Sequence, residues 1–191
     1  MMPLSDDLAL KPVRTTHGHV FLTSGAAHVV VKYLRTTWLW DKIRVQGGAY
    51  GGFCALDQRS GNFTYLSYRD PNLLETLDIY DQTPGFLKRA EIDKTELTRS
   101  IIGTIGDVDA YQLPDAKGFT SMQRYLAGET DEIRQRRRDE MLGANIADFR
   151  AFADALAELT ACGRVVVLGS ERPIGAVSAL RPGFLHVSKI I

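Results

Sequence analysis

The stretch Arg44-Val-Gln-Gly-Gly-Ala-Tyr-Gly-Gly-Phe53 joins a helical pattern to two extended runs and so decides where the chain turns into a sheet. Its four glycines permit positive φ and the close approach of another main chain. It also places Arg44 and Tyr50 six residues apart. Arginine offers a rigid fork of N–H donors and tyrosine a phenolic hydroxyl, so the pattern indicates a site that holds a peptide backbone. A structural interpretation stays open, in which Arg44 complements a helix dipole and Tyr50 packs in the sheet.

The residues on either side of this turn predict a helix and a hairpin. Apolar side chains recur three and four positions apart before the turn, which predicts a helix over residues 24–43, with a short strand at 19–23 ahead of it. After the turn, two runs rich in Phe and Tyr, residues 49–56 and 62–69, are separated by a short segment that contains Gly61. Such runs around a glycine-containing loop are typical of paired antiparallel strands.

The remainder of the chain predicts mostly helices. Asp70-Pro71 is expected to begin one, with Asp70 as its N-cap, and Thr83-Pro84-Gly85 is expected to interrupt it. Two strands are expected near the end, a buried one at residues 164–169 and an edge strand at 184–189. Between these regions, further helices are expected to begin at or next to Asp93, Pro114, Asp131 and Asn145.

These patterns predict an α+β fold, a two-layer domain with a largely antiparallel sheet covered by helices. With 191 residues and 45% hydrophobic composition, the chain has enough apolar surface for one globular domain with its own core. We expect residues 18–191 to form this single domain. Residues 1–17 are expected to be a poorly ordered leader or added segment.

Charge and cysteine content narrow the class of partner. Lys plus Arg and Asp plus Glu number 23 each, so the whole sequence has no bias toward nucleic acid or an anionic membrane. No apolar run approaches the roughly 20 residues that span a bilayer. Cys54 and Cys162 are expected to be buried free thiols of a soluble protein in a reducing compartment. Cytoplasm and an organellar matrix or stroma both remain open.

The histidines and the arginine-rich segment have structural explanations that outweigh functional ones. His17 and His19 lie two positions apart without a third ligand nearby, and His28 and His186 stand alone. The arginines within residues 134–138 are flanked by equal numbers of acidic residues, which is typical of a salt-bridged, solvated helix face.

Candidate nucleophiles and carboxylates are equally weak as catalytic groups. The serines lack a nucleophile-elbow context, and Asp107 and Asp109 are expected to cap or form turns. The serines in question are Ser24, Ser67 and Ser170.

Five blocks of sequence together carry a resemblance to a known family. They closely resemble the C-terminal region of the presequence proteases, a subfamily of the pitrilysin-type zinc metallopeptidases, or inverzincins. The resemblance covers about residues 24–184, and five blocks in one order are far more specific than any single motif. The blocks are Trp38-Leu-Trp-Asp-Lys-Ile-Arg-Val-Gln-Gly-Gly-Ala-Tyr-Gly-Gly-Phe-Cys54, Leu66-Ser-Tyr-Arg-Asp-Pro-Asn-Leu-Leu74, Leu77-Asp-Ile-Tyr-Asp81, Ile101-Ile-Gly-Thr-Ile-Gly-Asp-Val-Asp109 and Tyr111-Gln-Leu-Pro-Asp-Ala-Lys-Gly118.

The resemblance implies two homologous halves that enclose a chamber for short unfolded peptides. In the family, the N-terminal half binds zinc through His-x-x-Glu-His and a distant glutamate, and the C-terminal half contributes an arginine and a tyrosine. Arg44 and Tyr50 match these positions. Arg44 would bind a substrate carbonyl or carboxylate, and Tyr50 would stabilise the transition state in trans to zinc. Gly48, Ala49 and Gly51 would let the substrate strand lie close, by addition to a sheet edge.

The chain departs from the family because His-x-x-Glu-His is absent in either direction. We therefore expect no metal site and no cofactor in this chain, with zinc held in the parent protein or a partner half. The chain is expected to be inactive alone, as the non-catalytic C-terminal part of a zinc metalloendopeptidase that degrades short unfolded peptides such as targeting presequences.

Two kinds of partner follow from the resemblance, and two alternatives stay open. The expected partners are short unfolded peptides and the N-terminal catalytic half, in the same chain or a separate one. Neither nucleic acid nor a membrane is expected. One alternative is a stand-alone peptide-binding or assembly module without protease activity. The other is self-association of the isolated domain through an apolar face.

Overall fold

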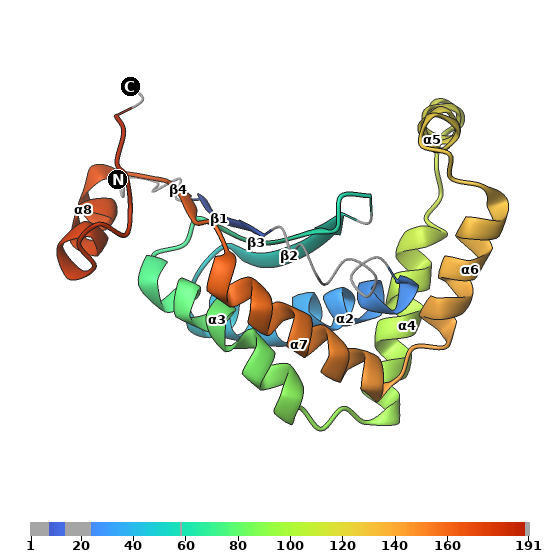
Figure 1. Cartoon of the computed structure of the whole chain (residues 1–191), viewed down its shortest axis with the longest axis horizontal. Coiled ribbons are helices and arrows are strands. Elements are labelled where there is room, and N and C mark those ends of the chain that lie inside the picture. The colour runs from blue at the N-terminus through green and yellow to red at the C-terminus, as the bar shows by residue number, and fades with distance from the viewer. Residues whose placement is uncertain (1–7, 14–23, 58, 190–191) are drawn as a thin grey trace.

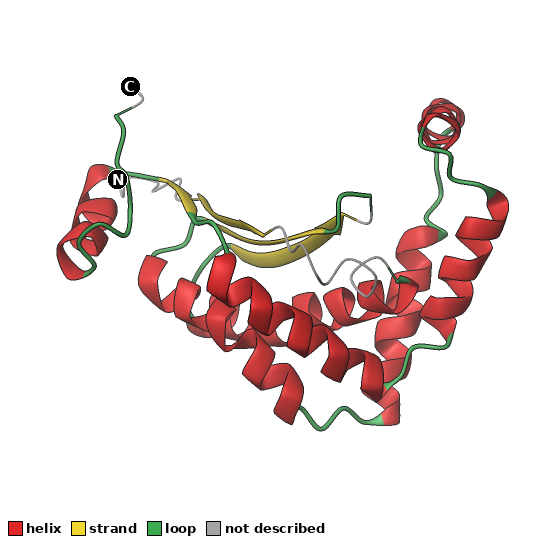
Figure 2. Cartoon of the chain, viewed as in Figure 1, coloured by secondary structure: helices red, strands yellow, loops and turns green. Residues whose placement is uncertain are grey.

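A computed structural model describes residues 8–13, 24–57 and 59–189. The strands form one antiparallel sheet in the order β2-β3-β1-β4, and α2, α3 and α7 lie on one face of it (Figures 1 and 2). This is the predicted α+β arrangement. The elements are β1 Leu8–Val13, α2 Gly25–Thr36, the π-helix η1 Trp40–Gln46, β2 Gly51–Asp57, β3 Asn62–Tyr68, α3 Leu73–Arg89, α4 Lys94–Val108, α5 Pro114–Leu126, α6 Asp131–Leu142, α7 Ile146–Cys162, β4 Val166–Leu168 and α8 Glu171–Leu180.

The helix predicted to run to residue 43 is divided in two. Ser24 caps the start of α2 by accepting a hydrogen bond from the Ala27 backbone N–H. The α-helix ends at Thr36, where Thr37 has a φ of −121° and a ψ of −88°. The chain then winds into η1, whose wider turn carries it to the glycine-rich stretch. The predicted strand at residues 19–23 lies outside the described residues.

The predicted hairpin is confirmed as β2 and β3. The two strands pair from Gly51 opposite Tyr68 to Asp57 opposite Asn62. Gly61 supplies a φ of +68° in the loop between them, a value that glycine adopts without strain. Side chains alternate along both strands, so that one face of the hairpin is buried under the helices and the other is more exposed.

Aromatic side chains fill the space between the sheet and the helices. Phe63 of β3 meets Phe152 of α7 edge to face, with ring centroids 5.6 Å apart. Tyr33 of α2 packs in the same way against Phe149 of α7, at 5.4 Å. Such pairs contribute roughly 0.5–1.5 kcal/mol beyond the burial of their area. The sheet, α2 and α7 therefore share one core.

Two details predicted for α3 are wrong. Asn72, not Asp70, occupies the N-cap position, and the helix continues through Pro84 to Arg89. A proline inside a helix leaves a carbonyl without its N–H partner and ordinarily breaks the helix. Here the Trp38 indole N–H donates to the Thr83 hydroxyl, 3.1 Å away, and that hydroxyl donates to the Ile79 carbonyl. Packing of this buried turn outweighs the local preference for a break.

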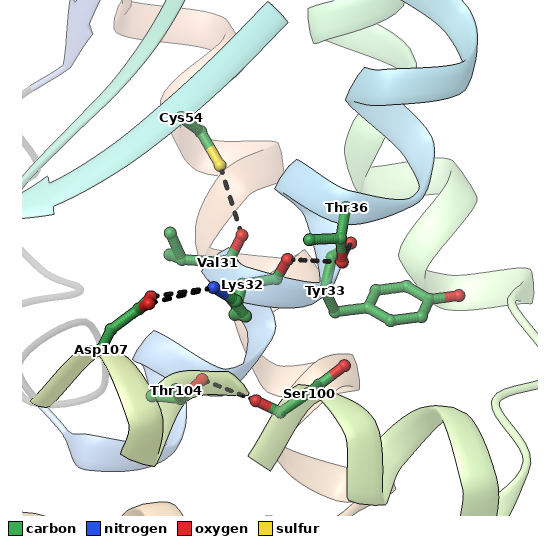
Figure 3. A network of polar contacts seen from close by, with 8 residues as sticks. All are labelled: Val31, Lys32, Tyr33, Thr36, Cys54, Ser100, Thr104 and Asp107. Carbon is green, nitrogen blue, oxygen red and sulfur yellow. Dashed lines mark hydrogen bonds and ion pairs between the residues drawn. The ribbon is translucent and has the colours of Figure 1, made fainter. Parts of the chain in front are cut away.

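Some side chains of α4 contact α2, and others hydrogen-bond to carbonyls of α4 itself, as Figure 3 shows. The Lys32 ammonium on α2 lies 3.0 Å from the Asp107 carboxylate on α4. Ser100 and Thr104 are buried, and their hydroxyls donate to carbonyls of α4 one turn earlier. These buried hydroxyls therefore have partners, as buried polar groups require. The predicted N-cap, Asp93, is confirmed by its bond from the Glu96 N–H.

Helix α5 begins at Pro114 as predicted but buries none of its residues. It projects beyond α4 and α6, at the right of the view in Figure 1. Phe119, Met122 and Leu126 are 58%, 49% and 75% exposed although their spacing gives the helix an apolar face. The apolar pattern that predicted the helix thus lies on a surface.

The C-terminal region differs most from the sequence prediction. A three-residue β4 replaces the predicted buried strand, and its Val166 and Leu168 are 52% and 53% exposed. Both share strand register with Leu66 and Tyr68 through β1, on the face of the sheet opposite the helices. A continuous apolar run therefore did not mean burial on both faces. Residues 185–189 contain no strand, whereas 171–180 form the unpredicted helix α8.

The first strand falls within the segment expected to precede the domain. Leu8–Val13 forms β1, which pairs with β3 on one side and β4 on the other. This part of residues 1–17 thus belongs to the sheet. The rest of that segment lies outside the described residues.

Replacement of Gly52 tests the contact that joins η1 to the sheet. A Cβ at Gly52 would lie 2.7 Å from the Cβ of buried Ile43. We expect Gly52→Ala to lower the free energy of unfolding by about 1–3 kcal/mol, measured by urea denaturation, because the core must shift to fit it. Gly106→Ala is the control, since its Cβ would meet nothing within 4 Å on α4. That variant should be neutral or more stable by up to about 1 kcal/mol. Equal effects of both would contradict the contact.

Candidate peptide-binding site

The turn between η1 and β2 is closed by its own backbone. The N–H groups of Gly47, Gly48 and Ala49 donate to carbonyls of Lys42, Arg44 and Ile43, at 3.0, 3.1 and 3.1 Å. π-Helical turns are rare and are frequently found at functional sites. Arg44 lies near the end of η1, and Tyr50 directly precedes β2. The closed turn places these two residues next to each other.

The glycines and Ala49 have different roles in this turn. Gly48 has a φ of +75°, and a side chain there would meet nothing within 4 Å. Gly48 is therefore an exposed, open position whose backbone conformation favours glycine. Gly51, in contrast, is buried, and a Cβ on it would lie 2.4 Å from the ring of Phe53. Ala49 is only 4% exposed and packs in the core.

The guanidinium of Arg44 is held in place by three neighbours although it is exposed to solvent. One of its N–H groups donates to the Tyr50 carbonyl, 2.9 Å away. Its central carbon lies 4.4 Å from the ring centroid of Trp40 and 5.6 Å from that of Tyr50. Cation–π contact with Trp40 and the hydrogen bond fix the fork, and its other N–H donors point to no described acceptor.

Tyr50 presents its ring and hydroxyl to solvent. The side chain is 61% exposed and packs edge to face against Tyr68, with centroids 5.9 Å apart. Its backbone N–H donates to the Tyr68 carbonyl at 3.1 Å, which ties it to the end of β3. Among the described residues, none hydrogen-bonds to the Tyr50 hydroxyl. The hydroxyl is thus available as a donor.

The end of β3 contributes residues that the sequence prediction did not assign to the site. Arg69 has a φ of +48°, and its guanidinium lies 5.9 Å from the Tyr50 ring and 5.3 Å from the Tyr68 ring. Asp70 is 4% exposed and accepts hydrogen bonds from the Thr76 hydroxyl and the Asn72 N–H. Asn72 in turn donates through its side-chain amide to the Gly47 carbonyl. The run Ser67-Tyr-Arg-Asp-Pro71 was the available signal, but it was interpreted as a strand followed by a helix cap.

The arginine-rich helix α6 is salt-bridged, as predicted. Arg134 pairs with Asp131 at 2.8 Å, and Arg136 lies 3.9 Å from Glu140. Arg138 makes a bidentate contact with Asp109 on the loop after α4, which lowers the pKa of that carboxyl through hydrogen bonding and charge. Asp107 forms an ion pair with Lys32. The two carboxylates considered for acid–base chemistry are therefore paired with separate cations.

Histidines and cysteines form no cluster in the described part of the chain. Within residues 8–13, 24–57 and 59–189, no three His, Cys, Asp or Glu side chains are grouped to hold a metal ion. His17 and His19 lie outside these ranges. Cys54 is a buried free thiol, as predicted, and burial raises its pKa. Burial and the nearby Arg137 lower the pKa of His28, whose Nε2 has no described partner.

Comparison with known proteins gives concordant results. The profile of the PreP C-terminal domain family matches residues 17–171. Presequence protease 1, chloroplastic/mitochondrial, from Arabidopsis thaliana is 48% identical over 198 residues, which cover 100% of this chain and 18% of that protein. The chain thus spans about a fifth of the length of this relative.

Solved structures share the fold at low sequence identity. An inactive peptidase domain from Bordetella parapertussis superposes with a TM-score of 0.66 at 15% identity, covering 87% of this chain and 94% of that one. Pitrilysin superposes with a TM-score of 0.52 at 15% identity, covering 96% of this chain and 20% of that one. In the described part of the chain, no helix is both long and apolar enough to cross a membrane.

His28 should make the stability of the domain depend on pH. The unfolded chain takes up a proton near the ordinary value of 6.5, whereas the folded chain does so only at lower pH. Acidification through 6.5 should therefore lower the free energy of unfolding until the folded pKa is passed. Urea unfolding at several pH values should show a smaller decline for His28→Gln than for the native chain. His186→Gln, at an exposed histidine, is the control and should leave the decline unchanged.

Proposed function

From the premise that this chain belongs to the PreP C-terminal domain family, we propose that it is the non-catalytic C-terminal part of a zinc metalloendopeptidase that degrades short unfolded peptides such as targeting presequences. In this function it binds the peptide with Arg44 and Tyr50, while the metal centre lies in the N-terminal part of the protein. The observation that carries the proposal is the meeting of these two side chains at one exposed turn, with the guanidinium 5.6 Å from the Tyr50 ring.

The two side chains have complementary tasks in peptide binding. Arg44 is held by Trp40 and by the Tyr50 carbonyl, so its remaining donors can bind a substrate carbonyl or carboxylate with little loss of side-chain freedom. The exposed Tyr50 hydroxyl donates to the carbonyl oxygen of the bond to be cleaved, as that oxygen gains negative charge. Arg44 thus contributes mainly to binding, and Tyr50 to the transition state.

The neighbouring residues provide room for an extended peptide. β2 is the end strand of the sheet order, so an added strand can pair along its outer edge. Gly48, the open position, lets a peptide main chain approach the turn. Ala49 and Gly51 are buried, so we propose that they shape the turn and offer the peptide no side-chain contact. Phe53 and Tyr68, 40% and 36% exposed, offer apolar contacts on the uncovered face.

The described residues of this chain form no zinc centre. The sequence has no His-x-x-Glu-His in either direction, and the described residues hold no group of three potential ligands. In zinc peptidases the metal activates the attacking water. We therefore assign that step to the N-terminal part of the protein, and to this chain only the binding and polarisation of the peptide.

Substitution of Arg44 and Tyr50 tests the proposal in a complex with the N-terminal part. Tyr50→Phe should lower kcat for a short unfolded peptide by roughly 10²-fold, because one donor to the developing oxyanion is lost. Arg44→Ala should act mainly by raising KM. Steady-state cleavage of a fluorogenic peptide would measure both.

Matched substitutions far from the turn provide the controls. Tyr111→Phe and Arg136→Ala alter side chains that are likewise exposed and should leave kcat/KM unchanged. Unaltered cleavage by the Arg44 and Tyr50 variants would contradict the roles assigned to these two residues. Tight, zinc-independent peptide binding by the chain alone, without cleavage in the complex, would instead favour a stand-alone binding module.

The exposed face of α5 supports a contact with the N-terminal part of the protein. Phe119, Met122 and Leu126 recur three and four positions apart and are each about half exposed or more. A 13-residue helix that buries nothing is marginal in water. We propose that this face, defined by these three residues, packs on the N-terminal part and drives self-association when the domain is isolated.

Sedimentation velocity of the isolated chain tests the α5 face. The native chain should associate as its concentration rises, and Phe119→Glu combined with Leu126→Glu should weaken association at least about tenfold, since each change removes roughly 1.5–3 kcal/mol of apolar burial. Ile102→Glu makes the same kind of change at an exposed position of α4 and should have no effect. A native chain that stays monomeric over a wide concentration range would refute self-association.

We propose that the protein lies in a reducing compartment. The Arabidopsis thaliana relative is named as chloroplastic/mitochondrial. An organellar matrix or stroma, or the cytoplasm, agrees with a buried free thiol at Cys54.

A further inference from the structure

We propose that Asn72 is a positioning residue for the Arg44–Tyr50 turn, residues 44–50. Its side-chain amide holds the Gly47 carbonyl and thereby sets where the Tyr50 hydroxyl lies. The inference rests on the proposed function, because it assumes that this hydroxyl donates to the carbonyl of the bond to be cleaved. It adds to the site a residue that acts through Tyr50 and not on the peptide itself.

Asn72 stands at the start of a helix but does not cap it. It occupies the N-cap position of α3, and its side chain makes no capping hydrogen bond. Asparagine is preferred at that position because its side-chain oxygen accepts an N–H of the first turn, as Asn145 does for the Ala147 N–H at 2.9 Å. The Asn72 amide instead donates to the Gly47 carbonyl, 25 positions earlier in the chain. The side chain therefore stabilises the turn in place of the helix.

The backbone of Asn72 is itself anchored. Its N–H donates to the buried Asp70 carboxylate, 2.9 Å away, and the other oxygen of that carboxylate accepts the Thr76 hydroxyl at 2.6 Å. The Asn72 carbonyl accepts the Thr76 N–H at 2.9 Å. Because both its N–H and its carbonyl are bound, Asn72 is a fixed point from which the side chain reaches Gly47.

The bond acts on the peptide unit between Gly47 and Gly48. Gly48 has a φ of +75°, and a Cβ there would meet nothing within 4 Å, so no side-chain packing holds this unit. Glycine is free to adopt many backbone conformations, and hydrogen bonds must therefore select one. The N–H of the unit donates to the Arg44 carbonyl at 3.1 Å, and its carbonyl accepts from Asn72. Without Asn72, only the first of these two bonds remains.

The position of Tyr50 depends on this backbone more than on packing of its ring. The side chain is 61% exposed and meets Tyr68 edge to face. Its N–H donates to the Tyr68 carbonyl at 3.1 Å, and its carbonyl accepts from the Arg44 guanidinium at 2.9 Å. A shift of the preceding glycines would move the hydroxyl, and a displacement of about 1 Å can cost roughly 10²-fold in rate. The Arg44 guanidinium also has Trp40 as a support, so the effect should fall mainly on Tyr50.

Asn72→Ser separates the role in the turn from the role in the helix. Serine is an equally good N-cap but lacks the amide that donates to Gly47. In the complex with the N-terminal part, kcat for a fluorogenic peptide should fall roughly 10- to 100-fold, with a smaller change in KM. The midpoint of urea unfolding should stay close to the native one, because the helix gains a cap. Asn72→Asp keeps the size of the side chain, removes the donor and should act in the same direction.

Two further measurements identify Tyr50 as the residue that Asn72 positions. In a Tyr50→Phe background, Asn72→Ser should lower kcat little further, because the positioned hydroxyl is already absent. In the isolated chain, amide hydrogen exchange followed by NMR should become roughly 2- to 10-fold faster at Gly48 and Tyr50, as expected for loss of one hydrogen bond. Asn62→Ser, at a half-buried asparagine of β3 where the hairpin turns, is the control and should change neither quantity.

Several results would overturn the proposal. Native kcat in Asn72→Ser, while Tyr50→Phe lowers it, excludes a positioning role. Losses that multiply fully in the double variant would indicate a general structural role, and unchanged exchange at Gly48 and Tyr50 would show that Asn72 does not hold the turn. Failure of the proposed function looks different. In that case Tyr50→Phe alone leaves kcat intact, or the native complex cleaves no peptide.

Discussion

The contact between Ile43 and Gly52 is the constraint on which the candidate site depends. Ile43 is fully buried at the inner side of η1, and a Cβ on Gly52 would come within 2.7 Å of its side chain. Only a glycine lets η1 lie this close to β2. Because Arg44 follows Ile43 and Tyr50 precedes Gly52 by two positions, this packing brings both side chains to one turn. Burial of an isoleucine thus sets the position of two exposed polar residues.

A second set of contacts joins this turn to the rest of the hairpin. Asp70 and Asn72 bind backbone groups on both sides, and Tyr68 packs against Tyr50. These contacts hold the turn that carries Tyr50, while Trp40 and the Tyr50 carbonyl hold the Arg44 guanidinium. Such support lowers the entropy that a bound peptide would otherwise cost.

Local patterns predicted the elements well where a short-range signal agreed with the tertiary environment. Ser24, Asp93 and Asn145 cap helices through bonds within three residues, and the β2–β3 hairpin follows from strand runs around Gly61. The predictions were wrong where distant packing decided the outcome. Pro84 stays within α3, at a buried turn where the Trp38 indole donates to Thr83, and Val166 lies on an uncovered face.

The amino-acid sequence alone determined the α+β class, the hairpin and the positions of Arg44 and Tyr50 on either side of a glycine-rich turn, because caps, strand runs and glycine preferences act within a few residues. Only the tertiary structure decided that Arg69 lies beside Tyr50 and that the apolar face of α5 is exposed. The first depends on bonds between residues more than twenty positions apart, such as Asn72 to Gly47. The second depends on which neighbours exist, and periodicity specifies an apolar face without specifying what covers it.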